Sequence, residues 1–308
     1  MRFLLSLLVL MSTLATWADD GSRLWLRFPD APSPTVSVTL DAASATATLS
    51  PADRAIVQTA VDELRSAWQG LPLTLRLGNE PSLQRDAFRI EKVLEESFLI
   101  TASSPTGLLY AAYFALRAQT MGDGCLCQAL GPNHAITERP QAVVRRVGIG
   151  NTALVEGRCP MLARALASVG INEVLIPDAD FGTIATLADV FLPYGITLRT
   201  SSLVSDPLPL TEATAWTDSH LQQYDIYAIG RQLWQADIVP ARTVCEWLAQ
   251  TFNDNPYFII SMRDAMLSPA AERTKRLFDT WQEMHSYVDS QRYEEVEQWL
   301  MQQLTNDK

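Results

Sequence analysis

Two aspartates spaced two residues apart, Asp178 and Asp180, stand in the stretch IPDADF directly after a predicted strand. Residues at i and i+2 lie on one side of an extended segment. Barrel enzymes keep their active residues at the carboxyl ends of strands, and a pair of carboxyl groups can act as general acid and general base. The alternative is a structural role, which the preference of Asp for turns and helix caps favours. Both residues are therefore candidate substrate-binding residues with capping as the competing interpretation.

Three arginines near this stretch, Arg145, Arg146 and Arg158, have the chemistry to recognise an acidic ligand. A guanidinium group binds a carboxylate through two parallel hydrogen bonds. The alternative is a solvated or ion-paired surface position, which is the commoner role of arginine. Arg145 and Arg158 are kept as candidate substrate-binding residues.

The spacing of the candidate residues argues against a metal site and against a dinucleotide-binding loop. Cys125 and Cys127 with His134 lack the second ligand pair of a structural zinc site, so we expect no metal. The run from Gly148 to Ala153 resembles a dinucleotide fingerprint, but Gly157 interrupts the helix that must follow. We expect no cofactor.

The elements that must position these residues change in character along the chain. Near the N-terminus, the alternation in Ser22–Phe28 predicts a strand with Trp25 on its polar face, and Thr35–Leu40 and Ser44–Ser50 are further strand candidates. Ser50 and Pro51 predict a helix start. Strands are expected at Leu71–Leu77 and Ser97–Ser103, followed by a turn and a helix over 108–118. The segment Gly131–Pro140 has no periodicity and predicts a linker.

Strand and helix then alternate, which is typical of a parallel sheet or a (β/α) barrel. Strands are expected at Ala142–Ile149, Ile171–Pro177 and Ile196–Leu203, and helices at Pro160–Gly170 and Ile184–Gly195. From Asp218 onward apolar residues recur at helical spacing. The Trp and Tyr residues there are expected in a core, with sugar-stacking platforms as the alternative.

The first residues predict export. Met1-Arg2, the apolar run Phe3–Met11 and the small residues of Thr16-Trp17-Ala18 are typical of a secretory signal over 1–18. An uncleaved anchor is the alternative, but the run is shorter than a membrane span. We therefore expect a periplasmic or extracellular protein without a membrane span. The net charge of −11 argues against nucleic acid as a partner.

Five segments, in order along the chain, carry a family resemblance. They are DGSRLWLRF, ITASSPTGLLYAAYFALRAQ, the pair ARALASVGINEVLI and LADVFLPYGITL, QYDIYAIGRQLWQADIVPARTVCEWLAQTF and RYEEVEQWLMQQL. This series resembles glycoside hydrolase family 67, the α-glucuronidases. The resemblance implies release of glucuronic acid or its 4-O-methyl ether from xylan fragments, with inversion, by a (β/α)₈ barrel between an α+β domain and a helical domain that often dimerises.

The chain departs from that family in its barrel. Roughly 80 residues between Pro140 and Asp218 support about three strand–helix units, whereas a full barrel needs at least about 200 residues. The resemblance places the family's acid and base on later strands, which have no counterpart here, so no catalytic residue carries over. The family's Asn-His-Trp-Asp-Asn run is replaced by Val147–Asn151, and its Glu-Arg-Gly by Glu156-Gly157-Arg158.

The expected fold class is an α+β N-terminal domain over 19–135, a truncated (β/α) barrel-like remnant over 141–217 and a helical C-terminal domain over 218–308. Three functions compete: a non-hydrolytic relative that binds a xylan-derived oligosaccharide or a partner, an active α-glucuronidase with a rearranged site, and a decayed product that folds poorly. Loss of both acid–base groups argues against the second, and locally consistent caps and periodicity argue against the third. A homodimer through the C-terminal helices is also expected.

Overall fold

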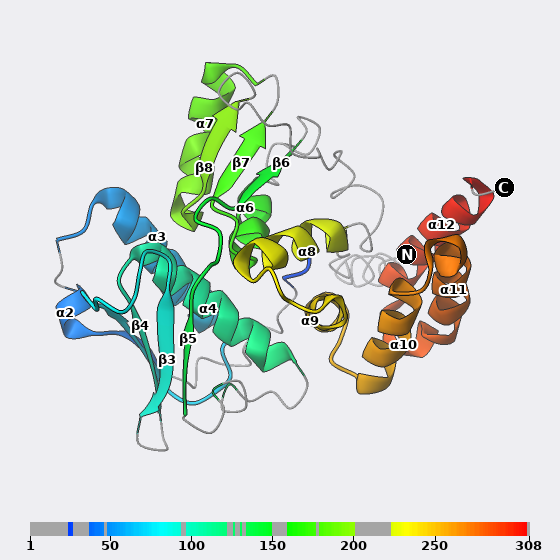
Figure 1. Ribbon diagram of the computed structural model, residues 1–308, viewed down its shortest axis with the longest axis horizontal. Helices are drawn as coiled ribbons and strands as arrows, with labels where there is room; N and C mark the ends of the chain where they lie inside the picture. The colour runs from blue at the N-terminus through cyan, green and yellow to red at the C-terminus, as the bar shows by residue number, and fades with distance from the viewer. Residues whose placement is uncertain are drawn as a thin grey trace, which may run out of the picture.

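The computed structural model describes residues 24–26, 37–45, 48–93, 97–121, 126, 130, 134–149, 159–176, 179–200 and 223–306. Within these ranges it contains two sheets and a series of C-terminal helices (Figure 1). The predicted signal over 1–18 lies outside them, as do Asp178 and Arg158.

The first sheet has five strands in the order β1-β2-β4-β3-β5. Strands β1, β2 and β4 are parallel, whereas β3 runs antiparallel to β4 and β5. Helices α3 and α4 pack against each other and α4 contacts three of the strands. The elements are β1 Val38–Leu40, α2 Ala42–Ala45, α3 Pro51–Ala67, β2 Leu73–Leu77, β3 Phe88–Val93, β4 Ser97–Ala102, α4 Pro105–Thr120 and β5 Ala135–Glu138.

Both long helices of this part begin at a serine followed by proline, as the sequence predicts for α3. The Ser50 hydroxyl accepts a hydrogen bond from the Asp53 backbone at 3.1 Å, and the Ser104 hydroxyl accepts one from Gly107 at 3.1 Å. Each cap satisfies an amide that has no partner inside the helix. Helix α4 is buried continuously from Gly107 to Arg117, so it forms the centre of the core.

The second sheet confirms the predicted alternation of strand and helix. Its three strands are all parallel, in the order β6-β7-β8, and all four residues of β7 are buried. The elements are β6 Arg146–Gly148, α6 Cys159–Ser168, β7 Glu173–Ile176, α7 Phe181–Phe191, the 3-10 turn η2 Leu192–Tyr194 and β8 Thr197–Thr200. The result is a mixed α/β fold with a short parallel sheet.

The rest of the described chain is helical, as predicted from Asp218 onward. The elements are α8 Gln223–Trp234, α9 Pro240–Thr251, α10 Pro256–Met266, α11 Ala270–Glu283, η6 His285–Tyr287 and α12 Ser290–Asn306. Trp247 and Trp281 are fully buried, and Trp281 stacks on Tyr293 with ring centroids 5.7 Å apart. The prediction that the aromatic residues of this part form a core is confirmed at these positions.

Three local predictions are wrong, each because tertiary contacts override a short pattern. Leu24, Trp25 and Leu26 are all buried and Trp25 lies in a turn, so the described part of that segment is not a strand with a polar face. The candidate strand at Ser44–Ser50 includes the end of the short helix α2. The predicted linker contains β5, which pairs with β3, a strand that the sequence analysis missed.

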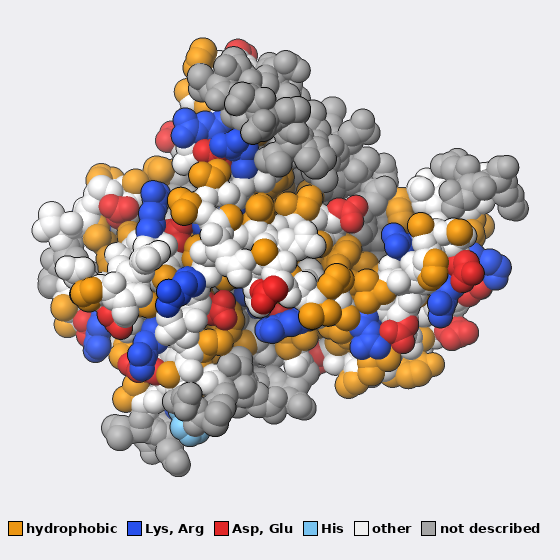
Figure 2. Space-filling model, viewed as in Figure 1, with side chains coloured by type: hydrophobic (Ala, Val, Ile, Leu, Met, Phe, Trp, Pro, Cys, Tyr) orange, Lys and Arg blue, Asp and Glu red, His pale blue; other side chains and the backbone are white. Residues whose placement is uncertain are grey.

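Helices α8 and α9 lie between the two sheets and α10–α12 (Figure 1). Acidic, basic and hydrophobic side chains are interspersed on the face that Figure 2 shows. No helix in the described ranges is both long and apolar enough to cross a bilayer.

Candidate functional site

The carboxyl edge of the parallel sheet is the position where the sequence analysis expects a site. Asp180 follows β7 and caps α7, where its Oδ1 accepts a hydrogen bond from the Thr183 backbone at 2.8 Å. The hydroxyl of Thr183 donates to Oδ2 at 3.2 Å. These bonds hold the pKa of Asp180 below its ordinary value. The capping interpretation therefore describes its contacts, and a lowered pKa is opposite to what a general acid needs.

Arg145 lies in the core and is fully buried. Its Nη2 donates to Asp86 at 3.0 Å, its Nη1 donates to the Ala142 carbonyl at 2.8 Å, and its Nε donates to the Gly170 carbonyl. The guanidinium group also lies over the rings of Tyr110 and Trp234 at 5.3 and 5.4 Å. The side chain is buried, so it is not the solvated or surface-paired arginine of the alternative interpretation, and each of its three guanidinium nitrogens donates to a protein group. It joins the two sheets to α8.

Arg146 lies next to Arg145 in sequence but points to another part of the molecule. Its Nε donates to Glu173, whose other oxygen accepts from Arg199 at 3.2 Å. Arg146 and Arg199 are partly exposed, whereas Glu173 is buried. This group connects β6, β7 and β8 across the sheet, and Asp180 lies beyond the opposite ends of these strands because β7 starts at Glu173.

A second cluster of buried charges lies where α4, α8 and α9 meet, and the sequence analysis missed it. Arg231 donates to Glu246 from Nε at 2.9 Å, and Tyr227 donates to the same carboxylate at 3.2 Å. Arg117 approaches from α4, with its Nε 3.9 Å from Glu246. Burial opposes the ionisation of Glu246, but Arg231 and Arg117 outweigh it and lower the pKa of the carboxyl. The sequence feature that could have indicated this cluster is that Arg117, Arg231 and Glu246 each lie among apolar residues of their helices.

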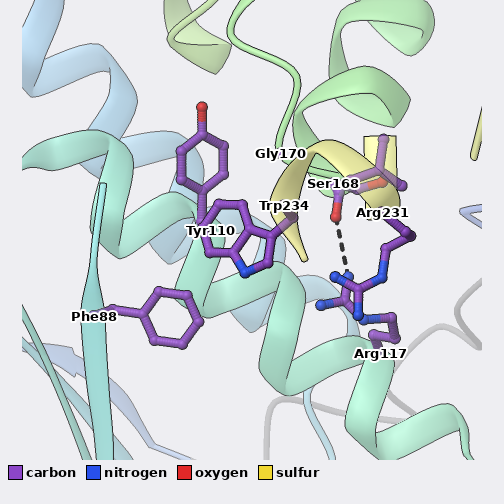
Figure 3. Close-up of a pocket in the computed structure, with 8 residues that line it drawn as sticks. Phe88, Tyr110, Arg117, Ser168, Gly170, Arg231 and Trp234 are labelled. Atoms are coloured by element: carbon purple, nitrogen blue, oxygen red, sulfur yellow. Dashed lines mark hydrogen bonds between the residues drawn. The ribbon is translucent and has the colours of Figure 1, made fainter. Parts of the chain in front are cut away.

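A small cavity adjoins this cluster (Figure 3). It has a volume of about 10 Å³ and is lined by Phe88, Tyr110, Arg117, Ser168, Val169, Gly170, Arg231 and Trp234. Figure 3 shows the guanidinium groups of Arg117 and Arg231 beside each other, with Trp234 between them and Tyr110. Ser168 accepts from Arg117 through its carbonyl at 3.2 Å, and its hydroxyl accepts from Trp25 at 2.9 Å.

A larger cleft of about 330 Å³ lies between the ends of α3, α4 and α9. It is lined by Gln69, Gln119, Thr120, Ala249, Phe252, Asn253 and Asp254. Amide, hydroxyl and carboxylate groups beside an aromatic ring match the polar and apolar character of a sugar unit, and the volume is within the range of about 300–1,000 Å³ for small-molecule sites. Gln119 and Asn253 are held by hydrogen bonds to Ala67 at 2.9 Å and to Tyr287 at 2.8 Å, so the walls are preorganised.

These sites differ in what chemistry they allow. Among the described residues that directly follow β6, β7 and β8, Asp180 is the one carboxylate. Asp225 in the first turn of α8 has a raised pKa, because partial burial disfavours its charge more than Arg273 favours it. It belongs to the helical part of the chain. The described ranges contain no group of three His, Cys, Asp or Glu side chains that could hold a metal ion.

Comparison with known proteins gives no match to a family model or to a curated protein. Several solved structures that resemble the chain are glycoside hydrolases. A family 20 β-N-acetylhexosaminidase from Streptomyces coelicolor is 12% identical, with a TM-score of 0.38 over 56% of this chain and 43% of that one. A family 20 exo-β-N-acetylglucosaminidase from Vibrio harveyi is 15% identical, with a TM-score of 0.32 over 91% of this chain and 53% of that one.

A family 138 enzyme that targets the pectin rhamnogalacturonan II is 12% identical, with a TM-score of 0.36 over 54% of this chain and 24% of that one. The chain thus spans less than half the length of the first structures that it matches. At these scores no residue role carries over from these enzymes, and membership of family 67 stays a prediction.

Proposed function

We propose that this protein is a carbohydrate-related, glycoside-hydrolase-like protein that binds xylan-derived oligosaccharides without hydrolysing them. One observation supports the loss of hydrolysis most directly. Asp180 is the described carboxylate that follows the strands of the parallel sheet. Its side chain caps the N-terminus of α7, and its pKa is lowered. An inverting hydrolase needs a protonated acid and a separate base on opposite faces of the sugar.

The cleft formed by Gln69, Gln119 and Asn253 is the proposed binding site. Its volume of about 330 Å³ accommodates a sugar unit, and its amides match sugar hydroxyl groups. Asp254 is an exposed carboxylate at this cleft, and no Lys or Arg is among the described residues that line it. A uronic acid carboxylate would be repelled there, so we assign the cleft to the neutral xylose units of a branched oligosaccharide.

Calorimetric titration tests this assignment. The protein is titrated with glucuronic-acid-branched and with unbranched xylo-oligosaccharides, and both are expected to bind. Asp254→Ala should weaken binding by about tenfold, since it removes a charged hydrogen-bond acceptor. Asp237→Ala is the matched control, because Asp237 is an exposed aspartate between α8 and α9. Absence of binding to either ligand would contradict the proposal.

Export to the periplasm or the extracellular space and a homodimer through the C-terminal helices belong to the same proposal. Xylan fragments are encountered outside the cytoplasm, which agrees with the predicted signal over 1–18. Fractionation of the producing cells tests the location. Light scattering of the purified protein tests the dimer. A monomer mass at all concentrations would contradict the proposed homodimer.

A further inference from the structure

We propose that Tyr257 and Tyr287 form a second sugar subsite beside the cleft, in which the ring of Tyr257 stacks on a xylose unit that extends beyond the cleft. This inference rests on the proposed function, because it names where the rest of a bound oligosaccharide lies. Trp247 and Trp281 of the helical part lie in a core, as the sequence analysis expects. Tyr257 departs from that core, since it is 56% exposed, and so fits the alternative of a sugar-stacking residue.

Exposure alone does not identify a site, because single apolar side chains are common on protein surfaces. Within the described ranges, the strongly exposed aromatic side chains are Tyr257 on α10 and Phe181 on α7. Phe181 begins the helix that packs beside the parallel sheet, whereas Tyr257 lies in the first turn of α10, directly after the loop that follows α9 (Figure 1). That loop forms one wall of the cleft, so position distinguishes the two rings.

Hydrogen bonds tie both tyrosines to this wall of the cleft. Asn253, which lines the cleft, donates from Nδ2 to the Tyr287 carbonyl at 2.8 Å. Its Oδ1 accepts from the Asn255 backbone at 2.9 Å, and the Asn255 side chain accepts from the Tyr257 backbone at 2.9 Å. The cleft is therefore linked to Tyr287 directly and to Tyr257 through the cap of α10.

The two rings support each other. Their centroids are 5.8 Å apart and their planes are inclined by 43°. Tyr287 is half-buried, so it packs against one side of Tyr257 while the rest of that ring faces solvent. A tyrosine has only two side-chain torsions, and one that is already held in place loses little conformational freedom when it binds a ligand. Tyr257 thus presents a preorganised aromatic surface.

The chemistry of this surface matches a neutral sugar. A xylose ring has C–H groups on its faces and hydroxyl groups around its edge. An aromatic ring buries the C–H face, and a phenol hydroxyl can exchange hydrogen bonds with a sugar hydroxyl. The cleft of about 330 Å³ accommodates a sugar unit, so a longer ligand continues onto the neighbouring surface. The expected ligand is the unbranched part of a xylo-oligosaccharide.

The dependence of binding on ligand length tests the subsite. The full chain is titrated calorimetrically with xylobiose, xylotriose and xylopentaose. We expect the wild-type affinity to rise with length, because only a ligand longer than the cleft also covers Tyr257. Tyr257→Ala should bind xylobiose as the wild type does, but should bind xylopentaose about three- to tenfold more weakly.

Three further variants show what the loss is due to. Tyr257→Phe keeps the ring and should keep the wild-type preference for xylopentaose. Phe181→Ala is the matched control, because it removes an exposed aromatic ring that is not next to the cleft, and it should change neither affinity. Asp254→Ala should weaken binding of both ligands by the same factor, since Asp254 lines the cleft itself.

A structural role for Tyr257 predicts different results. The cap of α10 uses the backbone of Tyr257, so Tyr257→Ala keeps that hydrogen bond and should unfold at the wild-type temperature. Light scattering shows whether the ring contacts a second subunit instead, and we expect the mass of Tyr257→Ala to equal that of the wild type. A lower mass would assign Tyr257 to a contact between subunits and overturn the subsite.

The outcomes separate this inference from the proposed function. Equal wild-type affinity for xylobiose and xylopentaose, or unchanged binding of xylopentaose by Tyr257→Ala, would overturn the subsite and leave the assignment of the cleft intact. Absence of wild-type binding to all three ligands would overturn both.

Discussion

At the scale of the residue, burial decides what each arginine does. Arg145 donates its hydrogen bonds to Asp86 and to backbone carbonyls, so it joins separate segments of the chain within the core. Arg146, its neighbour in sequence, forms a partly exposed pair with Glu173. Arginine forks suit a bound carboxylate and a buried aspartate equally well, so sequence alone does not separate these roles.

Replacing Arg145 tests whether it stabilises the core by joining these segments. Arg145→Met leaves Asp86 buried without its cation, and we expect the free energy of unfolding to fall by about 3–5 kcal/mol. Arg146→Met is the matched control, with an expected loss of about 1 kcal/mol or less because Arg146 is partly exposed and Glu173 keeps Arg199 as a partner. Urea denaturation measures both values. Equal losses in the two variants would show that Arg145 does not hold the core together.

The buried carboxylate Glu246 makes stability depend on pH. Its folded pKa lies below the ordinary value of about 4.5 for a glutamate carboxyl, because Arg231 and Arg117 outweigh the effect of burial. A lowered carboxyl pKa contributes stability above the unfolded value and loses it as the pH falls through the folded value.

We expect wild-type protein to lose stability as the pH falls below about 4.5. Glu246→Gln should be less stable at neutral pH but show a shallower dependence below that value. Denaturation at a series of pH values measures the two curves, and Asp279→Asn on the exposed face of α11 is the control. Parallel wild-type and Glu246→Gln curves would contradict the lowered pKa.

Local residue preferences predicted the role of Asp180 but not the cluster around Glu246. A helix cap depends on the next three residues, so the sequence carries that signal. Arg231 and Glu246 come from the consecutive helices α8 and α9, whereas Arg117 comes from α4, much earlier in the chain. Their contact depends on how α4, α8 and α9 pack, which a single sequence does not contain.

At the scale of the element, helices and buried parallel strands were predictable because their patterns are long or strongly apolar. Helices α3 and α6 and strands β7 and β8 lie where periodicity and turn residues predict them. Strand β3 carries Arg89, Glu91 and Lys92 among its apolar residues, so its sequence lacks the apolar pattern that predicts a strand. Trp25 belongs to a short segment that is buried against Tyr227 and Ser168 from distant parts of the chain, so its alternation was misleading.

The start of α3 offers a test of local stabilisation. Ser50→Ala removes the hydrogen bond to the Asp53 amide, and we expect a loss of about 1 kcal/mol in the free energy of unfolding. Ser50→Gly is the matched control, because glycine at this position costs only a few tenths of a kcal/mol. Chemical denaturation distinguishes the two. Equal stability of Ser50→Ala and wild type would mean that the cap contributes nothing.

At the scale of the whole molecule, the three parts of the chain meet at a junction of close contacts. Glu63 of α3 binds Arg164 of α6 through two hydrogen bonds of 2.5 and 2.7 Å. Gly170 has a φ of +86°, and a Cβ there would lie 2.5 Å from the Trp234 ring. The junction is therefore built for one arrangement of β/α unit and helix α8.

Gly170→Ala tests this arrangement. The substitution adds a methyl group against Trp234 and strains a positive φ, so we expect a loss of more than about 1 kcal/mol. Gly78→Ala is the control, because the nearest atom to its added Cβ is 4.0 Å away. Thermal unfolding measures both. A Gly170→Ala protein as stable as Gly78→Ala would show that the junction is looser than described.

The central claim, a glycoside-hydrolase-like molecule without hydrolysis, is tested most directly by an end-point assay. Protein at high concentration is incubated with glucuronic-acid-branched xylo-oligosaccharides, and free uronic acid is quantified by chromatography against a heat-denatured control. The account predicts no release above the control. Release that Asp180→Asn or Asp225→Asn abolishes would contradict it, and would identify an acid or base that the geometry described above does not provide.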